Sequence, residues 1–203
     1  MPRFLLATHN QGKVGEYRLL LGGLPFELLS LKELGIQEVA AEDGSTLEEN
    51  ARAKAEGYAA LSQLLTLAED SGLEVDALGG EPGVRSARYA GDNASDEELV
   101  RYLLDRLEGV PWERRTARFR CAIALAAPGR ETEQFVGQCL GFIALKPQGE
   151  KGFGYDPIFY LPELGKTMAQ LPLETKNQIS HRARAAHQAC RRLEQLRPEV
   201  IHP

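Results

Sequence analysis

Several classes of protein are disfavoured by what this sequence lacks. The 203 residues include only three cysteines, Cys121, Cys139 and Cys190, and no C-x-x-C pair. A disulfide framework or a structural zinc site would need more regularly spaced cysteines. No apolar run approaches the roughly 18 residues that span a bilayer, and no signal-peptide pattern opens the chain. We therefore expect a reduced, cytoplasmic protein without a membrane partner.

The chain also lacks an excess of positive charge. It carries 24 Lys and Arg against 29 Asp and Glu, a formal net charge of −5. Such a chain has no field that attracts long polyanions, so a nucleic-acid polymer is disfavoured as a partner. A small anionic ligand is still compatible, because a local group of lysines and backbone N–H groups is enough to hold it.

Hydrophobic periodicity predicts an α/β fold. Ser45 with Glu48, and Thr46 with Glu49, form two overlapping capping boxes at the start of the most clearly predicted helix. No repeat or linker divides the chain, so we expect one domain over residues 1–203. We expect an elongated central mixed sheet flanked by helices, with two lobes and an active-site cleft between them. Strands are predicted at 3–8, 26–31, 65–70 and from 73, a hairpin at 117–129 and 131–145, and helices at 12–21, 45–64, 95–107 and from Ser180.

The segment ATHNQGK, residues 7–13, resembles a phosphate-binding P-loop but departs from it. Ala7 stands where the P-loop has its first glycine, and Val14 follows Lys13 in place of Ser or Thr. A strand that turns directly into a helix still presents N–H groups and the positive end of the helix dipole to an anion. The segment therefore indicates either an independent phosphate-binding loop or an ordinary turn with a solvated lysine.

Two acidic segments are candidates for a cation site. AEDSG, residues 68–72, ends an apolar strand with two carboxylates and a glycine that predicts a turn. Alternation places Glu69 and Asp70 on opposite faces, so only one of them is expected to serve as a metal ligand. Glu42 in the other segment, AAEDGST, could join Asp70 around a hard cation such as Mg²⁺. The alternative interpretations are an Asx turn at the end of the strand for Asp70 and a solvated loop carboxylate for Glu42.

Lys54 is expected on the inner face of the long helix, among Leu47, Ala51, Tyr58 and Leu61. A charge at such a position needs a counter-charge or an anionic ligand. A structural salt bridge and a contact with an anionic ligand both satisfy this need, and the side chain could also extend outward to solvent, so the sequence leaves these alternatives open.

Two later segments are candidates for binding a base. GFGYDPIF, residues 152–159, places aromatic residues between glycines, which let a backbone approach a ligand closely. ISHRARA, residues 179–185, places His181 and Arg182 in the first turn of the last helix, where cations oppose the helix dipole. The alternatives are core aromatics, which we favour for Phe159, and a basic helix face.

Taken together, these motifs resemble the inosine/xanthosine triphosphate pyrophosphatases, which remove non-canonical purine nucleotides from the nucleotide pool. The matching segments follow the family's order over nearly the whole chain: ATHNQGKVGE, EDGSTLEENARAKA, AEDSGLEVDALGGEPGVRSARYAG, GFGYDPIF and K-x-x-x-ISHR. The resemblance implies Mg²⁺-dependent hydrolysis of ITP, dITP and XTP to the monophosphate and pyrophosphate, and a homodimer. A pyrophosphatase for modified pyrimidine or canonical nucleotides, and a non-catalytic nucleotide-binding protein, are the alternatives.

The resemblance also implies roles for individual residues. Asp70 is the expected catalytic acid or base and, with Glu42, a metal ligand. Position 9 departs from the family pattern, with His9 in place of glycine, and position 69 has glutamate in place of aspartate, so Glu69 is given no metal role. The residues expected to bind substrate are Thr8, His9, Asn10, Gln11, Gly12, Lys13, Lys54, Ser71, Phe153, Gly154, Tyr155, Asp156, Lys176, His181 and Arg182.

Overall fold

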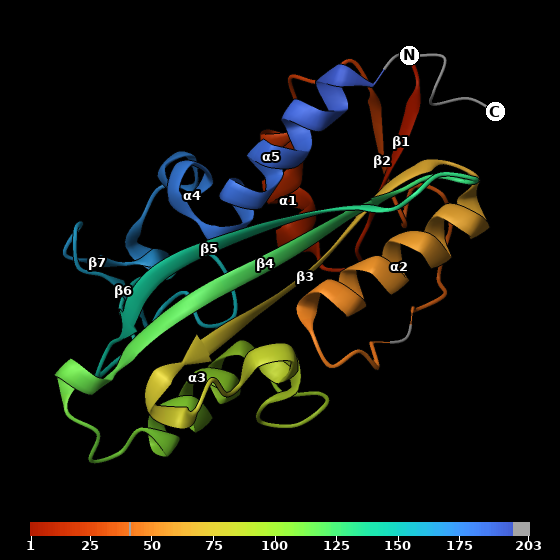
Figure 1. The fold of residues 1–203 in the computed structure, drawn as a ribbon. Coiled ribbons are helices and arrows are strands. Elements are labelled where there is room, and N and C mark those ends of the chain that lie inside the picture. Colours follow the sequence, from red (N-terminus) through yellow and green to blue (C-terminus); the bar gives the residue numbers. More distant parts are fainter. Residues whose placement is uncertain (41, 197–203) are drawn as a thin grey trace. The chain divides into compact units, whose positions relative to one another are not determined.

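The computed structural model describes residues 1–40 and 42–196 (Figure 1). Strands and helices alternate along the first third of the chain, and most of the later strands follow one another directly. The elements are β1 Arg3–Ala7, α1 Gln11–Leu20, β2 Glu27–Ser30, α2 Leu47–Ser62, β3 Leu65–Val75, α3 Asp96–Arg106, β4 Thr116–Ala126, β5 Glu133–Ile143, β6 Phe159–Leu161, β7 Lys166–Thr167, α4 Leu173–Ile179 and α5 His181–Gln195.

The strands form one mixed sheet in the order β2-β1-β3-β4-β5-β6-β7. β1 is parallel to both of its neighbours, with Leu5 opposite Leu29 on β2 and Thr66 on β3. β6 is antiparallel to β5 and to β7. β4 and β5 are adjacent and are joined directly by residues 127–132, a connection too short for a parallel crossover. The predicted α/β fold on a mixed sheet is therefore confirmed, and so is the hairpin.

The chain divides into two compact units. Unit 1 contains residues 1–70, 121–137 and the chain from 182 onward, and unit 2 contains residues 71–120 and 138–181. Each unit has a hydrophobic core of its own. The cleft expected between two lobes, and the single-domain assignment, stay predictions.

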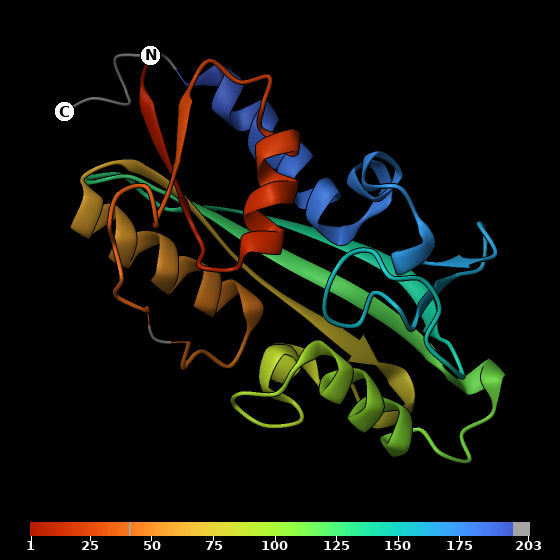
Figure 2. The same cartoon turned by 180° about the vertical axis from the view of Figure 1, so that it is seen from behind.

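Helices cover both faces of the sheet in unit 1. α1 and α5 lie on one face and α2 on the other, as the two opposite views show (Figures 1 and 2). Tyr17 of α1 and Ala186 of α5 belong to the same core as Leu67 of β3, and all three are fully buried. Successive residues of β3 therefore face different helices, which decides the surroundings of Glu69 and Asp70.

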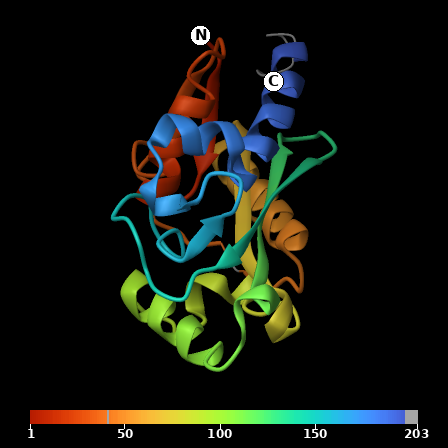
Figure 3. The same ribbon diagram turned by 90° about the vertical axis from the view of Figure 1, so that its left-hand side faces the viewer.

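Unit 2 packs α3 against the later strands. Leu99 and Leu103 of α3 share a core with Leu73 of β3 and Phe159 of β6. Figure 3 shows α3 in yellow-green and the short strands β6 and β7 in blue. The capping box predicted at Ser95 is present, because Ser95 and Glu98 each accept a hydrogen bond from the other's backbone N–H. Within the described residues, we found no helix of the length and apolarity that a membrane span requires.

The turn predicted at Ser71-Gly72 is wrong, because β3 continues without a break from Leu65 to Val75. Glycine is needed at position 72 for a different reason. A Cβ atom there would lie 2.3 Å from the carbonyl oxygen of Gly83, far inside any allowed contact. Gly72 therefore marks a close approach of two backbone segments, and Asp70 lies inside a strand and not at its end.

Of the two capping boxes predicted for α2, the Ser45–Glu48 box is absent and the Thr46–Glu49 box forms only the bond that the Thr46 side chain accepts. Thr46 is the N-cap, and its side chain accepts a hydrogen bond from the Glu49 N–H, as predicted. Ser45 pairs with Glu49 and not with Glu48, since both its N–H and its hydroxyl donate to the Glu49 carboxylate at 2.7 and 2.8 Å. One glutamate therefore serves both residues that precede the helix.

Candidate active site

The loop between β1 and α1 is ordered by its own side chains. Asn10 caps α1 by accepting a hydrogen bond from the Lys13 N–H at 3.0 Å, and the Thr8 hydroxyl oxygen accepts one from the Asn10 N–H at 3.2 Å. Both side-chain oxygens therefore accept hydrogen bonds within the loop itself. Helix geometry leaves the N–H groups of Gln11 and Gly12 without an acceptor inside α1, so these remain suited to an anion.

His9, which replaces the usual glycine, links the loop to its neighbours. Its Nε2 lies 3.1 Å from the carbonyl oxygen of Glu38, and its ring meets the Tyr58 ring edge-on at 6.5 Å between centroids. A hollow of about 330 Å³ lies beside the loop, and Lys32 contributes a cation to its lining. The hollow is lined by His9, Gln11, Lys32, Gly35, Ile36 and Gln37.

Lys13 does not extend into solvent, because its ammonium is paired with Glu69 at 2.6 Å. Glu69 is 2% exposed and accepts hydrogen bonds from several further groups. Arg182 binds it in a bidentate manner, with Nε and Nη2 each 2.9 Å from a carboxylate oxygen. The Tyr17 hydroxyl and the Cys121 thiol donate to Oε2 at 2.7 and 3.1 Å. Glu69, for which the sequence predicted no metal or substrate role, is therefore the centre of this network.

Electrostatics keep the network in one protonation state. Burial alone would raise the pKa of Glu69, but Arg182 and Lys13 outweigh burial and hold the pKa well below its usual range. Burial raises the pKa of Tyr17 and of Cys121, so both stay protonated and can donate. The network therefore joins a charged carboxylate to two cations and two neutral donors.

Arg182 is fixed on its other side by Glu16. Its Nη1 lies 2.7 Å from the Glu16 carboxylate, and the whole arginine is 1% exposed. The predicted position of Arg182 in the first turn of the last helix is confirmed. Its contact with a purine base stays a prediction, and such a contact would have to coexist with or replace these ion pairs.

Asp70 points to the other side of β3 and binds a different set of residues, as alternation predicts. Its two carboxylate oxygens accept hydrogen bonds from Lys54 Nζ at 3.1 Å and from Asn50 Nδ2 at 3.0 Å. Asn50 Oδ1 in turn accepts a hydrogen bond from the Gly44 N–H at 2.8 Å. Asn50 therefore ties Asp70 to the loop that carries Glu42. The sequence signal for Asn50 was a polar residue one turn before Lys54 on an otherwise apolar stripe.

Lys54 lies on the inner face of α2, as predicted, and is 8% exposed. Leu61, assigned to the same stripe, was predicted wrongly, since it is 53% exposed. The Lys54 ammonium lies 2.9 Å from Glu42 and 3.1 Å from Asp70. Burial lowers the pKa of Lys54, but the two carboxylates outweigh it and raise the pKa. The charge is therefore compensated within the chain, as the salt-bridge interpretation of Lys54 requires.

We expect Lys54→Met to lower the free energy of unfolding by about 1–3 kcal/mol, because the variant leaves Asp70 and Glu42 without their shared cation. Urea unfolding measures this loss. Gln63→Met, at the end of α2, is a control for adding a methionine. An unchanged or higher stability in Lys54→Met would contradict the ion pairs described here.

The same two carboxylates could hold a metal ion. Glu42 and Asp70 both contact the Lys54 ammonium, at 2.9 and 3.1 Å, so the two carboxylates lie near one another. Residues 1–40 and 42–196 contain no group of three or more His, Cys, Asp or Glu arranged for a metal, so Glu42 and Asp70 are a pair without a third such ligand. Two carboxylates fit Mg²⁺ in a phosphate site, where substrate oxygens and water complete the shell.

Unit 2 contains the predicted base-binding segment, a tight turn over residues 152–156. The Asp156 carboxylate accepts hydrogen bonds from the Phe153 N–H at 3.0 Å and from Lys176 Nζ at 2.5 Å. The same Nζ lies 4.8 Å from the centre of the Phe153 ring. Gly152 adopts a φ of +80°, and a Cβ there would lie 2.0 Å from Asp156 Oδ2. The turn therefore brings Phe153, Asp156 and Lys176 together, as predicted.

Three further residues that were predicted to bind substrate, Tyr155, His181 and Ser71, make contacts within unit 2 or lie inside β3. The Tyr155 hydroxyl donates to the Ser86 carbonyl at 2.8 Å, and its ring is 4% exposed. The His181 ring stacks on Phe119, with 4.7 Å between centroids. Ser71 lies inside β3, directly after Asp70. A part for these three residues in binding substrate stays a prediction.

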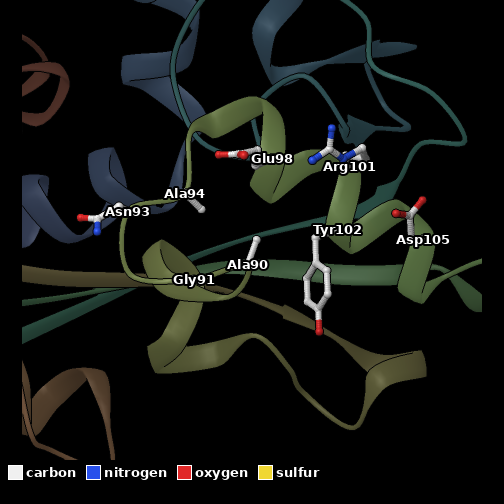
Figure 4. A pocket seen from close by; sticks show the side chains of 8 residues that line it. All are labelled: Ala90, Gly91, Asn93, Ala94, Glu98, Arg101, Tyr102 and Asp105. Atoms are coloured by element: carbon white, nitrogen blue, oxygen red, sulfur yellow. The ribbon is translucent and has the colours of Figure 1, made fainter.

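A different hollow of unit 2 contains none of the predicted residues. It has a volume of about 460 Å³ and lies between the loop before α3 and α3 itself (Figure 4). Arg101, Tyr102 and Asp105 extend into its surroundings from α3. We do not assign the active site to this hollow. Its walls contain no residue of the loop at 8–13, neither Glu42 nor Asp70, and no residue of the 152–156 turn.

Comparison with known proteins identifies the family of this chain. The model of the Ham1 family matches residues 4–192. The chain belongs to the Ham1 family. It is 54% identical over 185 residues to a dITP/XTP pyrophosphatase of Geobacter sulfurreducens, covering 91% of this chain and 93% of that protein. It is 47% identical over 194 residues to a dITP/XTP pyrophosphatase of Bacillus subtilis, covering 96% and 98% of the two chains.

Solved Ham1 structures share the fold. The Staphylococcus aureus Ham1 protein aligns with a TM-score of 0.85 at 45% identity, over 95% of this chain and 98% of that one. A HAM1 protein from Coxiella burnetii aligns with a TM-score of 0.87 at 40% identity, over 97% and 100% of the two chains. The resemblance deduced from the motifs is therefore confirmed at the level of family and fold.

Proposed function

We propose that this protein hydrolyses non-canonical purine nucleoside triphosphates, namely ITP, dITP and XTP, to the monophosphate and pyrophosphate. The observation that carries the proposal is its likeness to the dITP/XTP pyrophosphatases, at 47–54% identity over more than nine-tenths of the chain. The geometry supports it, because Lys13, Lys54 and Asp70 are positioned by buried partners and not by solvent.

The residues of unit 1 would act on the triphosphate. Asp70 accepts the proton of a water molecule while the water oxygen bonds to the α-phosphorus and the bond to the leaving pyrophosphate breaks. Lys13, Lys54 and the N–H groups at the start of α1 stabilise the negative charge of the pyrophosphate. Mg²⁺, held by Glu42 and Asp70, would neutralise charge on the phosphate oxygens. Attack at the α-phosphorus follows from the family likeness.

Charge balance supports the need for a divalent cation. Lys13 and Arg182 are matched by Glu69 and Glu16, and these four charges sum to zero. Lys54 faces two carboxylates, which leaves one negative charge in excess. Lys13 and Lys54 can still contact the phosphates, but because these carboxylates already balance their charge, the two lysines alone do not neutralise an incoming triphosphate. In our proposal, a bound Mg²⁺ ion would supply the missing positive charge.

The residues of unit 2 would act on the nucleoside. Phe153 offers an aromatic face, and Lys176 and Asp156 fix its position. Hypoxanthine and xanthine carry a 6-oxo group that accepts a hydrogen bond, whereas adenine presents an amino group and would leave the donor unpaired. Such mismatches can discriminate on the order of 10⁴-fold. Because Arg182 is held by Glu16 and Glu69, backbone N–H groups are the better candidates for this donor.

A homodimer and a cytoplasmic location complete the proposal. The first comes from the family resemblance noted in the sequence. The second rests on the three scattered cysteines, which suit a reducing compartment. The net charge of −5 supports a small-molecule substrate over a nucleic-acid polymer.

The test is a panel of nucleoside triphosphates with Mg²⁺. We expect conversion of ITP, dITP and XTP to monophosphates with release of pyrophosphate, and much slower conversion of ATP and GTP. Chromatography of the nucleotides, with separate assays for pyrophosphate and orthophosphate, gives the products. Initial formation of IDP and orthophosphate would overturn the proposal. Faster turnover of modified pyrimidine or canonical nucleotides would favour the related pyrophosphatase, and binding without turnover a non-catalytic protein.

A further inference from the structure

The 152–156 turn is held from outside by a residue that the sequence analysis did not select. The Gly154 N–H donates a hydrogen bond to Asp96 Oδ2 at 2.7 Å. Asp96 is the first residue of α3, and both residues belong to unit 2. A bond from a backbone N–H to a carboxylate at this distance is charge-assisted, and such bonds are stronger than those between neutral groups.

Asp96 lies on a part of the chain that is itself well fixed. The residue before it, Ser95, is locked by the reciprocal capping box with Glu98. The next turn of α3 is anchored by the buried side chains of Leu99 and Val100. A carboxylate at the start of such a helix can hold a neighbouring turn at a defined position, because its own backbone has little freedom.

Packing alone does not fix the turn on the side of α3. A cavity of about 620 Å³ lies there, with Asp96 and Gly154 both in its wall. Val100, Leu104 and Pro157 contribute apolar surface to the same cavity. Gly154 has a φ of +60°, which only glycine adopts readily, and it has no side chain of its own to pack against α3. The hydrogen bond to Asp96 therefore replaces packing that the cavity does not provide.

We propose that Asp96 is a positioning residue that fixes the Phe153–Gly154 peptide and, through it, the aromatic face offered to the base. This inference rests on the proposed function of the turn. Asp156 and Lys176 hold the turn from its inner side, and Asp96 holds it from its outer side. Without Asp96, the turn samples more orientations. Substrate binding must then order the turn, which lowers the affinity for the substrate.

The experiment compares Asp96→Ala and Asp96→Asn with Glu97→Ala. Glu97 is the next residue in the same exposed helical turn, so its removal changes the charge at the start of α3 equally. We expect Asp96→Ala to raise KM for ITP roughly three- to tenfold while kcat stays within about twofold, the scale of one ordinary hydrogen bond, because the bond to Asp96 is exposed to solvent. Asn keeps an acceptor oxygen, so Asp96→Asn should recover part of this loss. Glu97→Ala should match the wild-type protein.

Amide hydrogen exchange supplies a readout without substrate. Exchange at Gly154 should quicken severalfold in Asp96→Ala and stay unchanged in Glu97→Ala, with equal melting temperatures showing that both variants fold. Unchanged exchange, or a fall in kcat with KM constant, would overturn the positioning role. If the wild-type protein proved inactive toward ITP, the proposed function would fail instead, and the exchange data would still decide whether Asp96 holds the turn.

Discussion

Asp70→Asn should reduce turnover of ITP by about 10²-fold or more, the scale of general acid–base catalysis. The substitution keeps the size of the side chain but removes its charge and its ability to accept a proton. The neighbouring side chains increase the expected loss of turnover. Both oxygens of Asp70 accept hydrogen bonds, one from Lys54 Nζ and one from Asn50 Nδ2. An amide at this position must direct its NH₂ group at one of those donors.

Asp43→Asn is the matched control for this measurement. Asp43 is exposed, lies beside Glu42 in the same loop, and undergoes the same change from carboxylate to amide. We expect the control to turn over ITP at close to the wild-type rate. Comparison of urea unfolding separates chemistry from folding. Near-normal turnover of a folded Asp70→Asn variant would assign Asp70 to structure.

Arg182→Met should have the largest effect on stability, a loss of roughly 3–5 kcal/mol in the free energy of unfolding. The guanidinium group is 1% exposed and binds Glu69 and Glu16 at 2.7–2.9 Å. Methionine fills much of the same volume but leaves both buried carboxylates short of a cation. Lys13 stays near Glu69 and limits the loss on that side.

Two further variants identify the cause of this loss. Arg182→Lys keeps the charge but cannot reproduce the bidentate contact with Glu69, so it should fall between the wild-type protein and Arg182→Met. Adding Glu16→Gln to Arg182→Met removes one stranded charge and should recover part of the stability. A loss below about 1 kcal/mol in Arg182→Met, the range of an exposed ion pair, would show that the buried pairs are not formed in solution.

Much of the fold could be predicted because local patterns and tertiary packing agree. The apolar run of RFLLAT, the capping residues of α2 and the Pro-Gly between β4 and β5 each indicate an element that the structure contains. β3 was harder to predict, since a glycine inside a strand and a glycine in a turn look alike in sequence. What distinguishes them at Gly72 is the carbonyl of Gly83, which only the folded chain brings near.

For the site, the sequence predicted where individual side chains lie but not which residues they bind. Local spacing placed Lys54 on the inner face of α2 and separated Glu69 from Asp70, and both expectations are confirmed by their partners. The partners themselves were not predictable. Glu69 meets Arg182 across 113 residues, and Asp70 meets Asn50 across 20, so no local pattern records either pair. A charged residue on an apolar stripe reveals that a partner exists without revealing which residue it is.

Gly72 also limits how this chain can vary. At most buried positions of β3, one aliphatic residue can replace another of similar volume, and neighbouring side chains adjust. At position 72 the obstacle is a backbone carbonyl, which has no rotamer to change, so even the methyl group of alanine has no room. Sequence drift along this strand is therefore restricted most severely at its smallest residue, although its large hydrophobic residues supply most of the buried surface.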